Sequence, residues 1–162
     1  MPGLRNGRNI IAARNFWPER LGANQEQGRQ IRPMFDFNFA GDLPVFSTSQ
    51  IYSGKPNRKK DNDLNGIQFT DLPWLLESSE LKTVVEANQK RAKGNYARLY
   101  AMGVDAFRLY PRLKQLSALP HSRIFGVTGD LSIDEQGKIH RKMPFAIFKR
   151  GRPTAINLDQ NK

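Results

Sequence analysis

The chain has 162 residues, of which 38% are hydrophobic and 10% aromatic, and this is enough for the core of one modest domain and argues against global disorder. Its formal net charge of +11, from 26 basic and 15 acidic residues, favours polyanionic partners but does not distinguish nucleic acid, anionic lipid and anionic cell-wall polymers. It contains no cysteine, which excludes disulfides, thiolate metal sites and cysteine nucleophiles.

The beginning of the chain predicts neither a signal peptide nor a membrane span. Residues 1–15 include basic residues but no apolar stretch of the length that a signal peptide needs. No other stretch approaches the roughly 20 apolar residues of a spanning helix. We therefore expect a soluble chain, and any targeting segment of an exported protein would lie outside these residues.

Short apolar runs between turn-forming residues predict strands in the first half of the chain. Residues 9–13 (NIIAA), 43–48 (LPVFST) and 67–69 (IQF) are typical of short strands, the first two of them buried. Residues 1–8 are expected to be loose, and residues 16–28 to form a loop that passes into a helix.

A first helix is predicted within residues 25–39. Ile31, Met34 and Phe35 follow the i, i+3, i+4 spacing of one helix face. Pro33 lies inside this pattern and indicates either a kink or a helix start nearby.

Two further helical patterns follow the polar loop of residues 53–66. Ser79 is expected to be the N-cap of an amphipathic helix that runs to about residue 88. The strongest pattern spans residues 96–116, where Pro111 should kink the helix or begin a second one. The residues expected on its apolar side are Leu99, Tyr100, Gly103, Ala106, Phe107 and Tyr110.

After residue 123, apolar and polar residues alternate with a period of two, as in a β-strand. Alternation up to Ile147 predicts a hairpin of two or three strands, with Gly129 and Gly137 at its turns. Residues 152–162 are expected to form a frayed tail, loose over 153–162. The strand–helix alternation earlier in the chain predicts an α/β fold with parallel βαβ units. A parallel sheet needs helices on both faces, and the few helices here indicate that part of the fold is missing.

No catalytic or metal-binding constellation is evident. His121 and His140 lie far from any second ligand at metal spacing, so we expect two surface histidines. Ser79 and Lys82 match the Ser-x-x-Lys pattern of penicillin-binding enzymes, but no downstream SDN or KTG motif accompanies them. Ser79 is better explained as a helix cap. The sequence therefore predicts a protein that is not an enzyme and needs no cofactor or metal.

A partial calcium-loop pattern occurs in the polar loop. Asp61, Asp63 and Asn65 resemble the opening of an EF-hand loop, but its twelfth position, which requires glutamate, is Leu72. The flanking residues are also not helical in pattern. We therefore expect no calcium site here.

Four segments, taken in order, resemble the C-terminal domain of the penicillin-binding protein activator lipoproteins, the LppC or LpoA family. They are RQIRPMFDFNFAGDLPVFSTSQIYSG (29–54), DLNGIQFTDLPWLL (63–76), YARLYAMGVDAFRL (96–109) and GVTGDLSIDEQGKIHRKMPFAIFKRG (126–151). No single segment is diagnostic, but together they cover about three-quarters of the chain.

The resemblance implies a fold and an organisation. It implies a two-lobed domain of the type I periplasmic solute-binding kind, with mainly parallel sheets, of which residues 1–162 would be the C-terminal portion. Residues 63–76 would pass through the hinge between the lobes. The helix of residues 96–109 would then pack in the other lobe, and the final hairpin would return to the second.

The resemblance also implies a function. The family's proteins are anchored by an N-terminal lipid on the periplasmic side of the outer membrane and stimulate a class A penicillin-binding protein, which synthesises peptidoglycan. By this resemblance the chain is a non-catalytic activator that acts through protein–protein contact, with peptidoglycan as a further possible ligand. The lipidated cysteine and the preceding helical-repeat domain of the family have no counterpart in these residues.

Two groups of residues are candidates for binding. Lys55, Arg58, Lys59 and Lys60 place four basic residues within six, which predicts electrostatic attraction to the partner or to the anionic wall. Ser47, Thr48 and Ser49 follow a predicted strand and are candidates for a small-molecule site, although they could equally cap and turn the chain.

Two alternatives to the activator remain. The first is a solute-binding module of the type I fold, for which Ser47, Thr48 and Ser49 are the candidates. The second is nucleic-acid binding, which rests only on charge. The basic residues are scattered and no nucleic-acid-binding motif is evident, so this second alternative is not expected.

Overall fold

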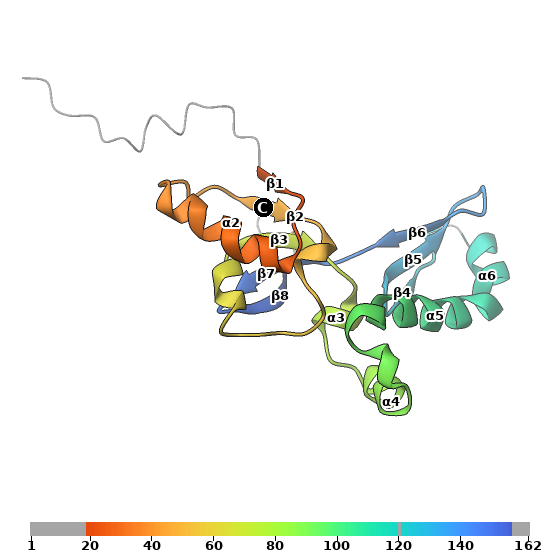
Figure 1. Ribbon diagram of the computed structural model, residues 1–162. Helices are drawn as coiled ribbons and strands as arrows, with labels where there is room; N and C mark the ends of the chain where they lie inside the picture. Colours follow the sequence, from red (N-terminus) through yellow and green to blue (C-terminus); the bar gives the residue numbers. More distant parts are fainter. Residues whose placement is uncertain (1–18, 120, 157–162) are drawn as a thin grey trace, which may run out of the picture.

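The computed structural model describes residues 19–119 and 121–156 (Figure 1). The strand expected at 9–13, and residues 1–8 and 157–162, for which loose segments were expected, lie outside the described residues. The helices are α2 (Gln25–Phe37), α3 (Pro73–Leu76), α4 (Glu80–Asn88), α5 (Ala97–Leu109) and α6 (Leu113–Ala118). Within the described residues, no helix is both long and apolar enough to cross a membrane.

The strands form two separate sheets (Figure 1). The five-stranded sheet has the order β1-β2-β3-β7-β8, and the three-stranded sheet has the order β4-β5-β6. The first comprises β1 (Glu19–Leu21), β2 (Val45–Ser47), β3 (Ile67–Thr70), β7 (Phe145–Lys149) and β8 (Arg152–Ile156). The second comprises β4 (Ile124–Gly126), β5 (Gly129–Ile133) and β6 (Ile139–Lys142). The α/β class is confirmed.

Parallel pairing is confined to β1, β2 and β3, so the expectation of mainly parallel sheets holds for these three strands alone. β7 pairs with β3 in the antiparallel direction, and β8 with β7. The three-stranded sheet is antiparallel throughout. The chain leaves the five-stranded sheet after β3, builds α3 to α6 and the three-stranded sheet, and returns with β7. The hairpin expected to return with the chain does not return as a unit, because β4, β5 and β6 stay in the separate sheet and β7 alone pairs with β3.

Two strands correct the sequence analysis. β1 lies where a loop was expected, and β8 lies where residues 152–162 were expected to be a frayed tail. Both are edge strands with polar residues, so neither carries the alternating pattern that identifies a half-buried strand. β8 follows the two-residue turn Arg150–Gly151, in which both residues have positive φ, 52° and 70°. This is the backbone of a tight hairpin turn, but Arg-Gly is not among its usual sequence signals.

The core of the five-stranded sheet is aromatic. Phe69 of β3 and Phe148 of β7 stack with ring centroids 5.1 Å apart, and Tyr52 packs against both. Helix α2 approaches this core closely at Gly28, where a Cβ would come within 2.9 Å of the Leu64 side chain and would collide with that of Ile51. A larger residue at this position would therefore force the Ile51 and Leu64 side chains to move.

Helix α2 lies within the predicted range and runs through Pro33, and Phe35 packs against the core as its pattern predicted, whereas Met34 is a correction. It begins at Gln25 after a capping box, in which the Asn24 side chain accepts from Gln27 N and the Gln27 side chain accepts from Asn24 N. It buries Gln25 and Gly28, whereas Met34, expected to share a face with Phe35, is 60% exposed.

Helix α5 buries a different side from the apolar side that its sequence pattern predicted. Ala97, Ala101, Asp105 and Leu109 are buried, and the expected apolar side is turned outward. Asp105 decides this orientation. Its carboxylate accepts hydrogen bonds from Val127 N at 2.9 Å, Thr128 N at 2.7 Å and Thr128 Oγ1 at 2.6 Å. A buried carboxylate needs such donors, and the β4–β5 turn supplies these three.

Several local predictions are confirmed. The Ser79 side chain accepts from Lys82 N at 3.1 Å and caps α4, so this serine serves as the expected helix cap. Pro111 separates α5 from α6 through a short 3₁₀ turn, Tyr110–Arg112. Gly129 and Gly137 have positive φ at the two turns of the three-stranded sheet.

Candidate functional site

The carboxyl ends of β1, β2 and β3 lie at one edge of the five-stranded sheet, because these strands run parallel. In open α/β sheets, ligands bind outside this edge. Three segments begin there. They are the first turn of α2, the 3₁₀ helix Ser49–Ile51 and the residue that follows β3, Asp71.

A polar hollow of about 520 Å³ lies beside these segments. It is lined by the first turns of α2, by Gln50 and by the loop of residues 53–60. Its lining includes three cations, Arg29, Lys55 and Lys60, and one carboxylate, Glu26. The hollow therefore carries a net positive charge.

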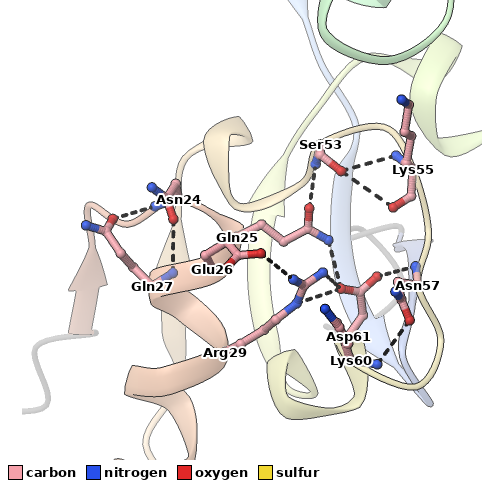
Figure 2. Close-up of polar contacts among 10 residues, drawn as sticks. All are labelled: Asn24, Gln25, Glu26, Gln27, Arg29, Ser53, Lys55, Asn57, Lys60 and Asp61. Carbon is pink, nitrogen blue, oxygen red and sulfur yellow. Dashed lines mark hydrogen bonds and ion pairs between the residues drawn. The ribbon is translucent and has the colours of Figure 1, made fainter.

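Asp61 anchors the loop to α2 (Figure 2). Its buried carboxylate accepts from Gln25 Nε2 at 2.8 Å, from Arg29 Nη2 at 2.7 Å and Nε at 3.2 Å, and from Asn57 N at 2.7 Å. Gln25 Oε1 also accepts from Ser53 N at 3.2 Å. Both ends of the loop are therefore held by side chains of one helix.

The residues of the partial calcium-loop pattern hold the loop in place instead of binding calcium. Asp61 points inward to Arg29, and Asn65 Oδ1 accepts from Gly151 N at 3.0 Å. In the part of the chain that the structure describes, no three His, Cys, Asp or Glu side chains are grouped so as to hold a metal ion.

Replacing Gln25 with alanine is expected to lower the free energy of unfolding by about 1–3 kcal/mol, because it leaves a buried carboxylate and a loop amide each short of one hydrogen bond. Gln30→Ala, at an exposed position of the same helix, is the matched control and should change it little. Chemical denaturation measures both. Equal effects of the two substitutions would contradict the role assigned to Gln25.

The four predicted basic residues are exposed, and two of them lie at the hollow. Lys55 and Lys60 line it, and Arg58 lies against the β7–β8 turn, where its carbonyl oxygen would collide with a Cβ at Gly151. Lys59 is also exposed. Among the ion pairs of residues 19–119 and 121–156, none includes any of these four residues. The loop thus presents its positive charge to solvent on an anchored backbone.

The predicted serine and threonine residues do not line the hollow. The Ser47 hydroxyl donates to the Leu21 carbonyl at 2.8 Å, inside the sheet, and the Ser49 carbonyl accepts from Arg98 Nη2 at 2.9 Å. Thr48 precedes the 3₁₀ helix and makes no side-chain cap bond. The lining contributed by this segment is instead Gln50 and Ser53, which sequence analysis did not single out.

Arg98 of α5 occupies the same edge of the sheet. Its guanidinium pairs with Asp71 through Nε at 3.0 Å and Nη2 at 2.6 Å, and it donates to the carbonyls of Ser49 and Tyr52. Asp71 is fully buried. This contact joins the helical part of the molecule to the five-stranded sheet.

The phenol of Tyr52 lies between the two networks. Burial, together with the nearby Asp61 and Asp71 carboxylates, raises the pKa of Tyr52 to about 12, although Arg98 lowers it. Burial and the carboxylates disfavour the charged phenolate. Tyr52 is therefore expected to stay protonated in the folded chain under ordinary conditions.

Stability is expected to fall as the pH rises from about 10 to about 12. An unfolded tyrosine loses its proton near pH 10, whereas folded Tyr52 keeps it until about pH 12, so alkali favours unfolding. Comparing urea unfolding at pH 9 and pH 11 should show a smaller loss of stability in Tyr52→Phe than in the unaltered chain. Tyr96→Phe, at a 58% exposed position, is the control, and an equal change in both variants would contradict the prediction.

The chain matches one protein family over most of its length. A family model described as "LppC putative lipoprotein" matches residues 20–151. "Penicillin-binding protein activator LpoA" of Yersinia pseudotuberculosis is 32% identical over 124 residues, 75% of this chain and 19% of that protein. The protein of the same name from Vibrio vulnificus is 36% identical over 127 residues, 76% of this chain and 21% of that protein.

Solved structures share the fold. The C-domain of LpoA from Haemophilus influenzae, described as a regulator of PBP1A, superposes with a TM-score of 0.70 at 22% identity, covering 92% of this chain and 48% of that domain. A branched-chain amino acid ABC transporter protein from Rhodospirillum rubrum superposes with a TM-score of 0.60 at 18% identity, covering 96% of this chain and 49% of that one. The chain thus spans about a fifth of the curated relatives and about half of the solved domain.

Proposed function

Because the chain belongs to the LppC lipoprotein family, as its match over residues 20–151 shows, we propose that it contributes to the activation of a class A penicillin-binding protein. The contribution is made by protein–protein contact, without catalysis by this chain. The place of action is the periplasmic side of the outer membrane. The family match carries this proposal, and the relatives' names as penicillin-binding protein activators supply its direction.

The polar groups of the site support a binding role rather than a catalytic one. Asp61 and Asp71, the two buried carboxylates at this edge of the sheet, are each held by an arginine and by further hydrogen bonds. Glu26, the carboxylate that lines the hollow, pairs with Arg29. A general acid or base must instead be within reach of a substrate proton. Ser79, the one match to a penicillin-binding enzyme motif, is engaged as a helix cap.

The basic loop of residues 55–60 is the proposed contact. Its four cations are exposed, and its ends are fixed to α2 through Asp61 and Ser53. A charged surface on a fixed backbone accelerates encounter with an oppositely charged partner and loses little conformational entropy on binding. For activation, the chain must bind the active state of the synthase more tightly than the inactive one.

The direct test is binding of the full chain to purified class A penicillin-binding proteins of V. vulnificus, whose activator is 36% identical to it. Surface plasmon resonance should show saturable binding to one of them, weakened by salt. A soluble, folded chain that binds none of these synthases at micromolar concentration would contradict the proposal.

A further inference from the structure

Three arginines meet at one small pocket between α5, α6 and β4. Arg108 of α5, Arg112 of the 3₁₀ turn and Arg123, just before β4, line a hollow of about 350 Å³, which we call the arginine pocket. Gln115 and Ser122 add neutral polar side chains, and the described residues that line the pocket include no carboxylate. The pocket lies on the opposite side of the molecule from α2 and is therefore separate from the polar hollow (Figure 1).

The arginines of the pocket have unused hydrogen-bond donors. Arg108 Nη1 lies 3.7 Å from Asp105 Oδ1, which is beyond hydrogen-bond distance, and that carboxylate already accepts three hydrogen bonds from the β4–β5 turn. Within residues 19–119 and 121–156, the side chains of Arg112 and Arg123 make no ion pair and no hydrogen bond. Two of the three guanidinium groups thus keep all their donors for a ligand.

One wall of the arginine pocket is apolar. Leu116 of α6 and Ile124 and Phe125 of β4 complete its lining. Leu116 is buried, whereas Phe125 is 77% exposed, so its ring offers apolar surface to a ligand beside the three charges. A ligand that fits both walls has an anionic group and an apolar part.

The number and geometry of the charges favour a phosphate group. A single carboxylate would neutralise one of the three positive charges, whereas a phosphate monoester carries nearly two negative charges and three strong acceptor oxygens. The planar fork of a guanidinium group binds such oxygens in pairs. The volume of the pocket is at the lower end of the range for ligand sites, which suits a headgroup rather than a folded partner.

We propose that the arginine pocket binds the phosphate or diphosphate group of an amphiphile, with the apolar part of that ligand along Phe125. Its three positive charges select the anionic group, and the exposed ring favours an amphiphile over free diphosphate. This inference is independent of the proposed contact with a synthase, which uses the loop of residues 55–60.

Calorimetric titration of the 162-residue chain with geranyl diphosphate tests the proposal, at an ionic strength of about 0.15 M. Inorganic diphosphate supplies the charge alone, and geraniol supplies the apolar part alone. Geranyl diphosphate should bind saturably and at least about fivefold more tightly than inorganic diphosphate, because part of its chain leaves water at Phe125. Geraniol should not bind detectably. Equal affinity for the two diphosphates would overturn the assignment to an amphiphile.

Substitutions at the pocket separate its two walls. Arg112→Gln with Arg123→Gln should weaken the binding of both diphosphates at least about tenfold, because charge-assisted hydrogen bonds are lost. Phe125→Ala should lower the affinity for geranyl diphosphate to that for inorganic diphosphate and leave the latter unchanged. All three side chains are exposed, so the fold should be retained.

Arg91→Gln with Arg141→Gln is the matched control, since it removes the same charge at exposed positions elsewhere. It should leave the affinity for geranyl diphosphate within about twofold of the unaltered chain, because exposed charges at a distance are largely screened. Equal weakening by the two double variants would show attraction by total charge and overturn the proposal. Tighter binding of a hexaglutamate peptide through Arg112 and Arg123 would overturn it in favour of an acidic protein segment.

Discussion

Replacing Arg98 with methionine is expected to lower the free energy of unfolding by about 3–5 kcal/mol, the cost of removing one partner from a buried ion pair. Asp71 is 1% exposed in its side chain and receives two hydrogen bonds from this guanidinium. The same guanidinium holds the carbonyls of Ser49 and Tyr52, so its loss also detaches α5 from the carboxyl edge of the sheet. Denaturant titration followed by circular dichroism measures the effect.

A second variant separates the ion pair from general packing. The double substitution Arg98→Met with Asp71→Leu removes both charges, and it should be less destabilised than Arg98→Met alone because no unpaired carboxylate remains. Arg112→Met, at an exposed position, should change stability by less than about 0.5 kcal/mol. If Arg98→Met costs as little as Arg112→Met, the role assigned to this contact is wrong.

Reversing Arg58, Lys59 and Lys60 to glutamate is expected to slow association with the class A penicillin-binding protein by at least about tenfold at low salt. Charge steering of this kind changes association rates by roughly 10- to 1000-fold, and it weakens as salt increases. All three side chains are exposed, so the change should leave the fold intact. Association rates at two ionic strengths, measured by surface plasmon resonance, give both quantities.

The matched control reverses Lys138, Arg141 and Lys142, which are exposed near and on β6. It changes the net charge by the same amount at a different place. The account predicts a smaller effect there than in the loop. An equal slowing by both triple variants would assign the attraction to total charge rather than to the loop, and no slowing by either would exclude the electrostatic contribution.

Sequence analysis identified those features of the fold that depend on neighbouring residues. Ser79 could be predicted as a helix cap because the group that it accepts from, Lys82 N, is only three residues away in the sequence. Pro111 ends α5, and Gly129 and Gly137 form turns, through the conformation of their own backbone. The family resemblance, confirmed by the match over residues 20–151, supplied the α/β fold class.

The orientation of α5 could not be predicted in this way. The apolar pattern of Leu99, Phe107 and Tyr110 predicted the wrong buried side, because the side buried in this chain is the one that carries Asp105. The donors that stabilise that carboxylate lie more than twenty residues away, at Val127 and Thr128. Hydrophobic periodicity cannot reveal a partner so distant in sequence.

The candidate site was predicted in part. The cluster of basic residues at 55–60 could be predicted from the order of residues in the sequence, and the structure places Lys55 and Lys60 at the polar hollow. The Asp61 anchor was missed, because Gln25 lies 36 residues before it and the calcium-loop pattern that includes Asp61 does not involve Gln25. Ser47, Thr48 and Ser49 stay a prediction, with Ser47 and Ser49 engaged in backbone contacts.

The central claim is that this chain contributes to activation of a peptidoglycan synthase. It is tested most directly by glycan polymerisation with purified class A penicillin-binding protein of V. vulnificus and a chimaera of V. vulnificus LpoA in which this chain replaces the segment that it matches. The account predicts that the chimaera stimulates polymerisation and that reversal of Arg58, Lys59 and Lys60 reduces this stimulation. A folded chimaera that leaves the polymerisation rate unchanged, beside unaltered V. vulnificus LpoA that raises it, would contradict the account.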